Sequence, residues 1–313
     1  MNLSFLFPGQ GSQKVGMGKD IFEQSDFAKK RFEEANDILE RNIKNIIFDG
    51  TEEVLKQTEN TQPAMFLIES VIADLLKQNG IFPSFTLGHS LGEYSALYAS
   101  EVFDFATGID LVAKRGELMA EAGKRYKGAM AAILGMEKEK IISYLLEIKN
   151  GVVVSANENS PEQTVISGDS AAVESACEIL KANGAKRAVA LAVSGAFHSP
   201  LMKDAADEFS KYLEDKKFND AKYPVITNVR AKPEKSADTI KSLLVEQLLS
   251  PVRWVDCQNE LFDVGVRNAV EVGPGNVLKG LMKKTVAEIE VVNCADWENV
   301  ISIMETYKTE EKK

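Results

Sequence analysis

The chain has 313 residues, of which 44% are hydrophobic and 27% charged, and its formal net charge is -10. This length and balance are typical of a globular protein with a large core, built as about two domains or as one domain with an insertion. The negative charge argues against nucleic acid as the main partner, because phosphate binding favours a basic surface.

Cysteine and histidine content narrows the chemistry further. The three cysteines, Cys177, Cys257 and Cys294, are odd in number and widely spaced, which favours free thiols in a reducing cytoplasm over a disulfide framework. No apolar run approaches the roughly 20 residues of a membrane-spanning helix, so no membrane partner is expected. The only two histidines, His89 and His198, have no second ligand at metal-binding spacing, so no metal site is expected.

The first third of the chain alternates short β-like runs with longer helical runs. The expected elements are a strand at 3–7, a helix at 26–39, a helix within 62–80 and a strand at 84–87. Pro63 near the start of the third element and Gly80 just past its end are the usual punctuation of a helix. Alternation of this kind predicts an α/β architecture with a parallel sheet.

The middle of the chain changes character. The expected elements are strands at 129–134, 152–156, 164–167 and 187–193, helices at 137–148 and 170–182, and a polar turn at 157–163. Their βαββαβ order is the ferredoxin-like pattern and predicts a small subdomain at 125–194. It would be inserted between 1–124 and 195–313, which form the large α/β subdomain. The second part of that subdomain is expected to hold a strand at 225–228, a helix at 236–249 and a strand at 269–272.

A serine flanked by glycines stands where the strand at 84–87 meets a helical run. Gly88-x-Ser90-x-Gly92 matches the nucleophile elbow of the α/β-hydrolase fold, a sharp turn from strand to helix in which flanking side chains would collide. The helix that follows directs unpaired N–H groups at the serine oxygen, and the N–H of Leu91 can form half of an oxyanion hole. The alternative is a turn serine of no consequence.

A serine nucleophile needs a base. His89 adjoins Ser90 and is expected to point elsewhere, as part of the pocket wall. His198 lies where the inserted subdomain returns to the larger one, and it is the remaining candidate. No Asp or Glu between Ser90 and His198 stands in a convincing strand-end loop, so an amide or a backbone carbonyl could orient the imidazole instead.

Six short motifs follow one another along the chain. They are FPGQGSQ from Phe7, GHSLGE from Gly88, RG at Arg115, GAFHS from Gly195, PVRW from Pro251 and EVGPG from Glu271. Together they resemble the malonyl-CoA:acyl carrier protein transacylases and the related acyltransferase domains of fatty acid and polyketide synthases. The resemblance spans residues 7–275. It implies an α/β-hydrolase-like core with an inserted ferredoxin-like subdomain.

The resemblance also implies roles for four residues. Ser90 would be the acyl-accepting nucleophile and His198 its base. Gln10 would supply the second oxyanion donor through its backbone N–H, and a carbonyl of Gln247 would orient His198. Without the resemblance, the glycine-rich loop around Gln10 would be a candidate phosphate cradle, although Met17 stands where a P-loop needs lysine.

Two further residues are implied to select the substrate. Arg115 taken alone predicts a surface salt bridge, whereas the resemblance implies that it binds the free carboxylate of a malonyl group. Phe197 resembles the malonyl-selecting version of its loop. Gly195 replaces the histidine usual in polyketide domains and favours a stand-alone fatty acid enzyme. EVGPG is equally compatible with packing and with ligand contact.

The implied reaction transfers a malonyl group from malonyl-CoA to the phosphopantetheine thiol of acyl carrier protein through a malonyl-serine ester, supplying extender units for fatty acid biosynthesis without a cofactor. The carrier is acidic, so a local basic dock is expected, with Lys283 and Lys284 as candidates. A serine hydrolase and a non-catalytic carrier-binding scaffold remain as alternatives. The sequence leaves open whether the carrier serves fatty acid or polyketide synthesis, and a monomer is expected.

Overall fold

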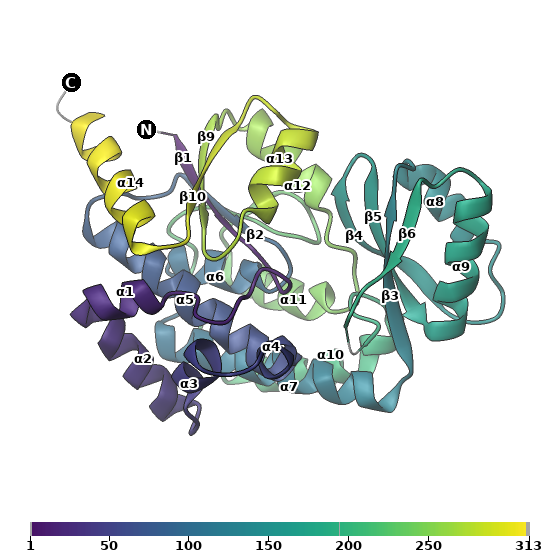
Figure 1. Ribbon diagram of the computed structural model, residues 1–313, viewed down its shortest axis with the longest axis horizontal. Helices are drawn as coiled ribbons and strands as arrows, with labels where there is room; N and C mark the ends of the chain where they lie inside the picture. Colours follow the sequence, from purple (N-terminus) through teal and green to yellow (C-terminus); the bar gives the residue numbers. More distant parts are fainter. Residues whose placement is uncertain (1, 194, 311–313) are drawn as a thin grey trace.

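Two β-sheets organise the part of the chain that the structure, a computed structural model, describes: residues 2–193 and 195–310 (Figure 1). Met1, Ser194 and residues 311–313, which fall within the expected divisions 1–124, 125–194 and 195–313, lie outside the described residues. The larger sheet has the order β10-β9-β1-β2-β7-β8. Its strands are β1 Leu3–Phe7, β2 Phe85–Gly88, β7 Val225–Ile226, β8 Pro233–Glu234, β9 Asn268–Val272 and β10 Glu290–Cys294.

The larger sheet is parallel except for the β7–β8 pair at its edge, in agreement with the α/β expectation. All five residues of β1 are buried, as is typical of a central parallel strand covered on both faces. Leu3, Phe5 and Phe7 pack in one core with α5 and α7, whereas Leu6 packs on the opposite face with α12 and α13. The strand period of two therefore divides β1 between two helical layers.

Helices surround this sheet (Figure 1). They are α1 Lys19–Gln24, α2 Asp26–Ile38, α3 Ile43–Phe48, α4 Glu52–Lys56, α5 Thr58–Gln78, α6 Gly92–Ala99, α7 Phe105–Arg125, α10 Lys203–Glu214, α11 Ala237–Gln247, α12 Trp254–Asp263, α13 Val277–Thr285 and α14 Trp297–Glu310, with a short 3-10 helix η1 at Pro200–Met202. No helix of the described chain is both long enough and apolar enough to cross a membrane.

The smaller sheet is antiparallel and has the order β4-β5-β3-β6. Its elements are β3 Gly128–Leu134, α8 Lys138–Leu145, β4 Val153–Ser160, β5 Gln163–Asp169, α9 Ser170–Ala182 and β6 Arg187–Ala190. The helices α8 and α9 cover the face of this sheet that points away from the larger body (Figure 1). A bridge between Asn157 and Val252, with an N–H···O bond of 2.9 Å from Glu158 to Val252, ties β4 to the larger body.

Two expected boundaries in the smaller sheet are wrong. The polar residues Asn157–Ser160 belong to β4 and not to a turn, because they pair with β5 and are buried against the segment at Val252. The hairpin turn is only two residues long. The last strand ends at Ala190 and not at Val193, because its residue pairing with β3 extends no further than Ala190 opposite Ala131.

The helix expected within 62–80 begins earlier, at Thr58, so Pro63 lies inside it. A proline at this position removes the N–H that would donate to the carbonyl of Glu59. Arg41 compensates, because its Nη2 donates to the Glu59 carbonyl oxygen at 2.6 Å. The interior proline is therefore tolerated by a side chain from a distant segment, which helix punctuation alone does not reveal.

Candidate active site

Ser90 stands on a strained turn between β2 and α6. Its backbone φ is 52°, in the left-handed region that side chains rarely adopt. A Cβ at Gly88 would overlap the backbone of Gly92, and a Cβ at Gly92 would overlap the carbonyl of Phe7 in β1. The packing of this turn thus leaves no room for a side chain at position 88 or 92.

Gly92→Ala should destabilise the protein by at least about 3 kcal/mol, because the collision is with rigid backbone rather than with a movable side chain. The measurement is the free energy of unfolding in urea. Gly280→Ala is the matched control, since nothing lies within 4 Å of its added Cβ in α13. The control should be neutral or stabilising by about 0.5–1 kcal/mol. Equal stability of the two variants would contradict the steric explanation.

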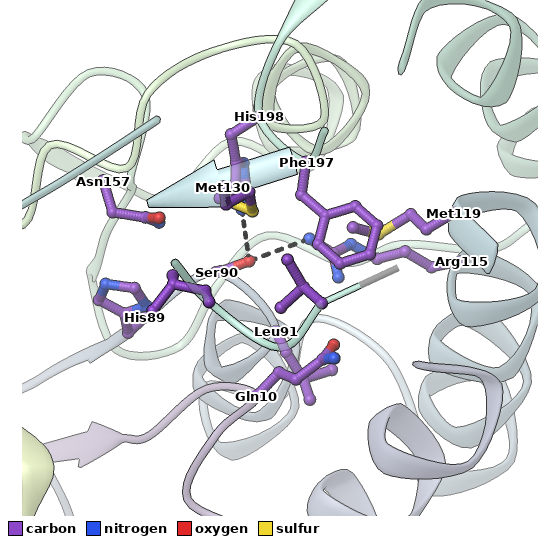
Figure 2. Close-up of a pocket in the computed structure, with 12 residues that line it drawn as sticks. Gln10, His89, Ser90, Leu91, Arg115, Met119, Met130, Asn157, Phe197 and His198 are labelled. Carbon is purple, nitrogen blue, oxygen red and sulfur yellow. Dashed lines mark hydrogen bonds between the residues drawn. The ribbon is translucent and has the colours of Figure 1, made fainter. Parts of the chain in front are cut away.

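The structure brings Ser90 and His198 into contact across 108 residues of sequence (Figure 2). Ser90 Oγ lies 2.7 Å from His198 Nε2, and His198 Nδ1 lies 2.8 Å from the backbone carbonyl oxygen of Gln247. A carbonyl only accepts, so Nδ1 carries the proton and Nε2 is the acceptor that faces the serine hydroxyl. A neutral acceptor therefore stands where a hydrolase triad has its acid.

The environment keeps His198 neutral. Burial, reinforced by the charge of Arg115, lowers the pKa of His198 to about 3. The imidazole is thus unprotonated at neutral pH and can accept the proton of Ser90.

Arg115 is not at the surface, where a salt bridge would place it, but is only 1% exposed. Its Nη2 donates to Ser90 Oγ at 3.2 Å and to Gln247 Oε1 at 2.9 Å, and its Nη1 donates to Gln62 Oε1 at 2.9 Å. The guanidinium also lies over the ring of Tyr94, 5.3 Å from its centroid. Among the residues that the structure describes, no carboxylate forms an ion pair with it. A buried cation beside the nucleophile is therefore held only by neutral groups.

The serine opens into a cleft that residues of both bodies line, among them Ser90 of the larger body and Met130 of the smaller (Figure 2). Gln10 and Leu91 lie on its floor, and neither backbone N–H has an acceptor within the described chain. The N–H of Leu91 stands at the start of α6, where the helix dipole favours negative charge. Apolar side chains also line the cleft, namely Met119, Met130, Leu191, Val193 and Phe197. The cleft thus combines unpaired N–H donors with an apolar lining.

His89 lines the same cleft but turns away from the serine. Its Nε2 lies 2.8 Å from Asn159 Oδ1, and its ring meets Trp254 edge-on at 5.4 Å. Burial lowers the pKa of His89. This imidazole belongs to the wall, where the sequence analysis expected it.

Three polar residues around the site were not found from the sequence. Asn228 Oδ1 accepts from the N–H of Ser90 at 2.7 Å, and Asn228 Nδ2 donates to the carbonyl of Gly88 at 2.7 Å. The other two are Gln62, which accepts a hydrogen bond from Arg115, and Glu93, which accepts one from Gln247. The signal for Asn228 was its place just after β7, since carboxyl ends of neighbouring parallel strands share one edge of a sheet.

Other expectations concern groups outside this cleft. Lys283 and Lys284 lie exposed in the last turn of α13 and are not among the cleft-lining residues. Within residues 2–193 and 195–310, no group of three or more His, Cys, Asp or Glu side chains is arranged to hold a metal ion.

The cleft brings together a serine hydroxyl, a neutral imidazole and two N–H groups without acceptors in the described chain, the groups that serine-dependent acyl transfer requires. Comparison with known proteins agrees, because residues 4–311 match the family model described as the acyl transferase domain. The chain belongs to this acyl transferase family.

Relatives and solved structures are similar over nearly the whole chain. The malonyl CoA-acyl carrier protein transacylase of Bacillus subtilis is 45% identical over 310 residues, covering 98% of each chain. The crystal structure of an acyl carrier protein S-malonyltransferase from Vibrio cholerae matches with a TM-score of 0.94 and 42% identity, over 97% of this chain and 100% of that one. A malonyl-transacylase in complex with its type II PKS acyl-carrier protein matches with a TM-score of 0.94 and 40% identity, over 98% and 100%.

Proposed function

We propose that this protein transfers the malonyl group of malonyl-CoA to the phosphopantetheine thiol of acyl carrier protein. The observation that carries the proposal is Arg115, a buried cation without a carboxylate partner in the described chain, 3.2 Å from the nucleophilic oxygen of Ser90. A guanidinium binds a carboxylate through two parallel hydrogen bonds. An acyl group that carries its own carboxylate fits beside Ser90, and the relatives named above act on malonyl groups.

In the first half-reaction, Ser90 Oγ gives its proton to His198 Nε2 and attacks the thioester carbonyl carbon. The N–H groups of Gln10 and Leu91 hold the oxyanion. The carbon–sulfur bond then breaks, and the coenzyme A sulfur takes the proton from His198. A malonyl-serine ester remains.

In the second half-reaction, the carrier's thiol gives its proton to His198 and its sulfur attacks the ester carbonyl. The bond to Ser90 Oγ breaks, and the serine regains the proton from His198. Both thiols use one site in turn, so ping-pong kinetics follow. No step calls for a cofactor.

Intact-mass spectrometry after brief mixing with malonyl-CoA tests this function. We expect a malonyl adduct on Ser90 that disappears when carrier protein is added, with malonyl-carrier as the product. An adduct that discharges to water at the same rate without carrier would instead support a serine hydrolase. Absence of any adduct, with carrier binding retained, would support a scaffold.

Phe197 is proposed to close the apolar wall against larger acyl groups, since it is buried beside His198 and lines the cleft. The fold details are proposed on similar grounds. The larger body is classed as α/β-hydrolase-like because the serine turn joins a strand to a helix in a mainly parallel sheet. The smaller is classed as ferredoxin-like from its β4-β5-β3-β6 order.

The proposed subdomain division is 1–124 with 195–313 for the larger body and 125–194 for the smaller. Two features of the chain support this division. Helix α7 passes into β3 at the first boundary, and the chain returns to the larger body after β6 at the second. A cytoplasmic location is proposed because the expected substrates are cytoplasmic metabolites and the cysteines are free.

Charge reversal at Lys283 and Lys284 should raise the apparent KM for carrier protein several-fold and leave that for malonyl-CoA unchanged, because both lysines are exposed at the end of α13 and the carrier is acidic. Steady-state kinetics with each substrate varied in turn is the measurement. Charge reversal at Lys30, exposed on α2, serves as the control. An unchanged KM for the carrier would remove these lysines from the docking surface.

A further inference from the structure

Glu93 is a buried carboxyl group one turn beyond the nucleophile. It lies in the first turn of α6 and is 1% exposed. Its Oε2 accepts from Gln247 Nε2 at 2.7 Å and from the N–H of Asn228 at 3.1 Å. The acyl-transfer steps use neither Glu93 nor these two contacts directly, although both partners touch the catalytic groups.

The bond from Gln247 to Glu93 fixes which way the Gln247 amide points. Nε2 faces Glu93 and the carbonyl of Ser90, so Oε1 is turned to accept from Arg115 Nη2. If the amide were reversed, its NH2 group would face the guanidinium, donor against donor. Because Glu93 acts as an acceptor, Arg115 donates to Gln247 and Gln247 in turn donates to Glu93.

The second bond supports the serine turn. Glu93 holds the backbone N–H of Asn228, whose side chain bonds the N–H of Ser90 and the carbonyl of Gly88. One oxygen of Glu93 thus steadies both the arginine side and the serine side of the site. These hydrogen bonds support a turn whose backbone is strained.

The intervening amide also preserves the charge of Arg115. A carboxylate in direct contact would form an ion pair with the guanidinium and compete with a substrate carboxylate. Gln247 Oε1 is a neutral acceptor, so it fixes the guanidinium while leaving its charge for the substrate. Burial raises the pKa of Glu93 to about 7, but Oε2 can accept both bonds whether or not the group carries a proton on its other oxygen.

We propose that Glu93 is a positioning residue for acyl selection: as a hydrogen-bond acceptor it orients the Gln247 amide and thereby aims Arg115 at the substrate carboxylate. The inference rests on the proposed function, because it needs a carboxylated acyl group as substrate. It predicts an effect on malonyl transfer that exceeds any effect on acetyl transfer.

Three variants separate the effect of the hydrogen-bond acceptor at position 93 from the effect of its negative charge. Glu93→Met removes both and should lower the malonyl-to-acetyl ratio of kcat/KM about tenfold or more, since a misdirected amide loses a hydrogen bond to a charged group. Glu93→Gln keeps an oxygen in place and should restore most of the ratio. Glu93→Asp keeps the charge but withdraws the oxygen by one methylene, so it should also lower the ratio.

Glu69→Met is the matched control, because Glu69 is equally buried on α5 and takes no part in these hydrogen bonds of the described chain. Its ratio should equal that of the wild type. In an Arg115→Ala background, Glu93→Met should change the ratio no further.

A wild-type ratio in Glu93→Met, or equal losses for both acyl groups, would overturn the proposal, as would a Glu93→Gln variant as defective as Glu93→Met. If Glu93→Met does not fold, the test passes to Glu93→Asp. A wild-type malonyl-to-acetyl ratio of kcat/KM in that variant would likewise overturn the proposal. These outcomes differ from failure of the proposed function, in which the wild-type protein itself forms no malonyl adduct.

Discussion

Replacing Ser90 with alanine should abolish the acyl-enzyme and lower turnover by at least about 10³-fold. In the proposed mechanism the acyl group is bonded to the serine oxygen between the two half-reactions, and no other hydroxyl or thiol lines the cleft within the described residues. Removing the nucleophile of a covalent mechanism leaves only binding and oxyanion stabilisation. Intact-mass spectrometry and a steady-state assay of malonyl-carrier formation provide the two measurements.

Ser95→Ala is the control for this variant, because Ser95 is buried on the same helix, α6, and does not line the cleft. It should form the adduct at the wild-type rate. A Ser90→Ala protein that still takes up a stoichiometric malonyl group would show that another residue is acylated. If Ser90→Ala kept full biological function, the protein would be a scaffold.

The serine turn was predictable because its determinants are local. The turn requires only glycines at 88 and 92, a strand before them and a helix after them, all of which can be recognised in a short stretch of sequence. A tertiary contact that also requires glycine is that of Gly92 with the carbonyl of Phe7. It follows from the parallel pairing of β1 with β2.

The partners of the catalytic groups were less predictable because they come from distant segments. The contact between His198 and the Gln247 carbonyl was expected from family resemblance, whereas residue chemistry alone left the acceptor open. Glu93 gave no recognisable signal, since a glutamate in the first turn of a helix usually only complements the helix dipole. Asn228 was marked only by its place just after β7. The burial of Arg115 also reverses what its amphipathic helix suggested.

Arg115→Ala should lower kcat/KM for malonyl transfer about 10- to 100-fold while changing acetyl transfer much less. The loss corresponds to about 1.5–3 kcal/mol for one charged hydrogen-bonding group. Competing malonyl-CoA and acetyl-CoA in one reaction with carrier protein gives the ratio directly. Lys114→Ala is the control, because Lys114 is the neighbouring cation of α7 and pairs with Glu117 at 3.0 Å. Equal losses for both acyl groups would contradict the carboxylate-binding role.

The same substitution should alter the pH dependence, and the sign of the change is fixed by the electrostatics. Burial and the charge of Arg115 lower the pKa of His198, in that order, so removing the charge raises this pKa from about 3. As the proposed base, His198 acts only when neutral, so activity should be lost as pH falls through the pKa of His198. The wild-type profile should therefore show no loss from His198 between about pH 5 and 8. In Arg115→Ala the acidic limb should move to higher pH, as acetyl transfer and imidazole NMR can both measure. An acidic limb that stayed in place would mean that Arg115 does not set the protonation of its neighbouring base.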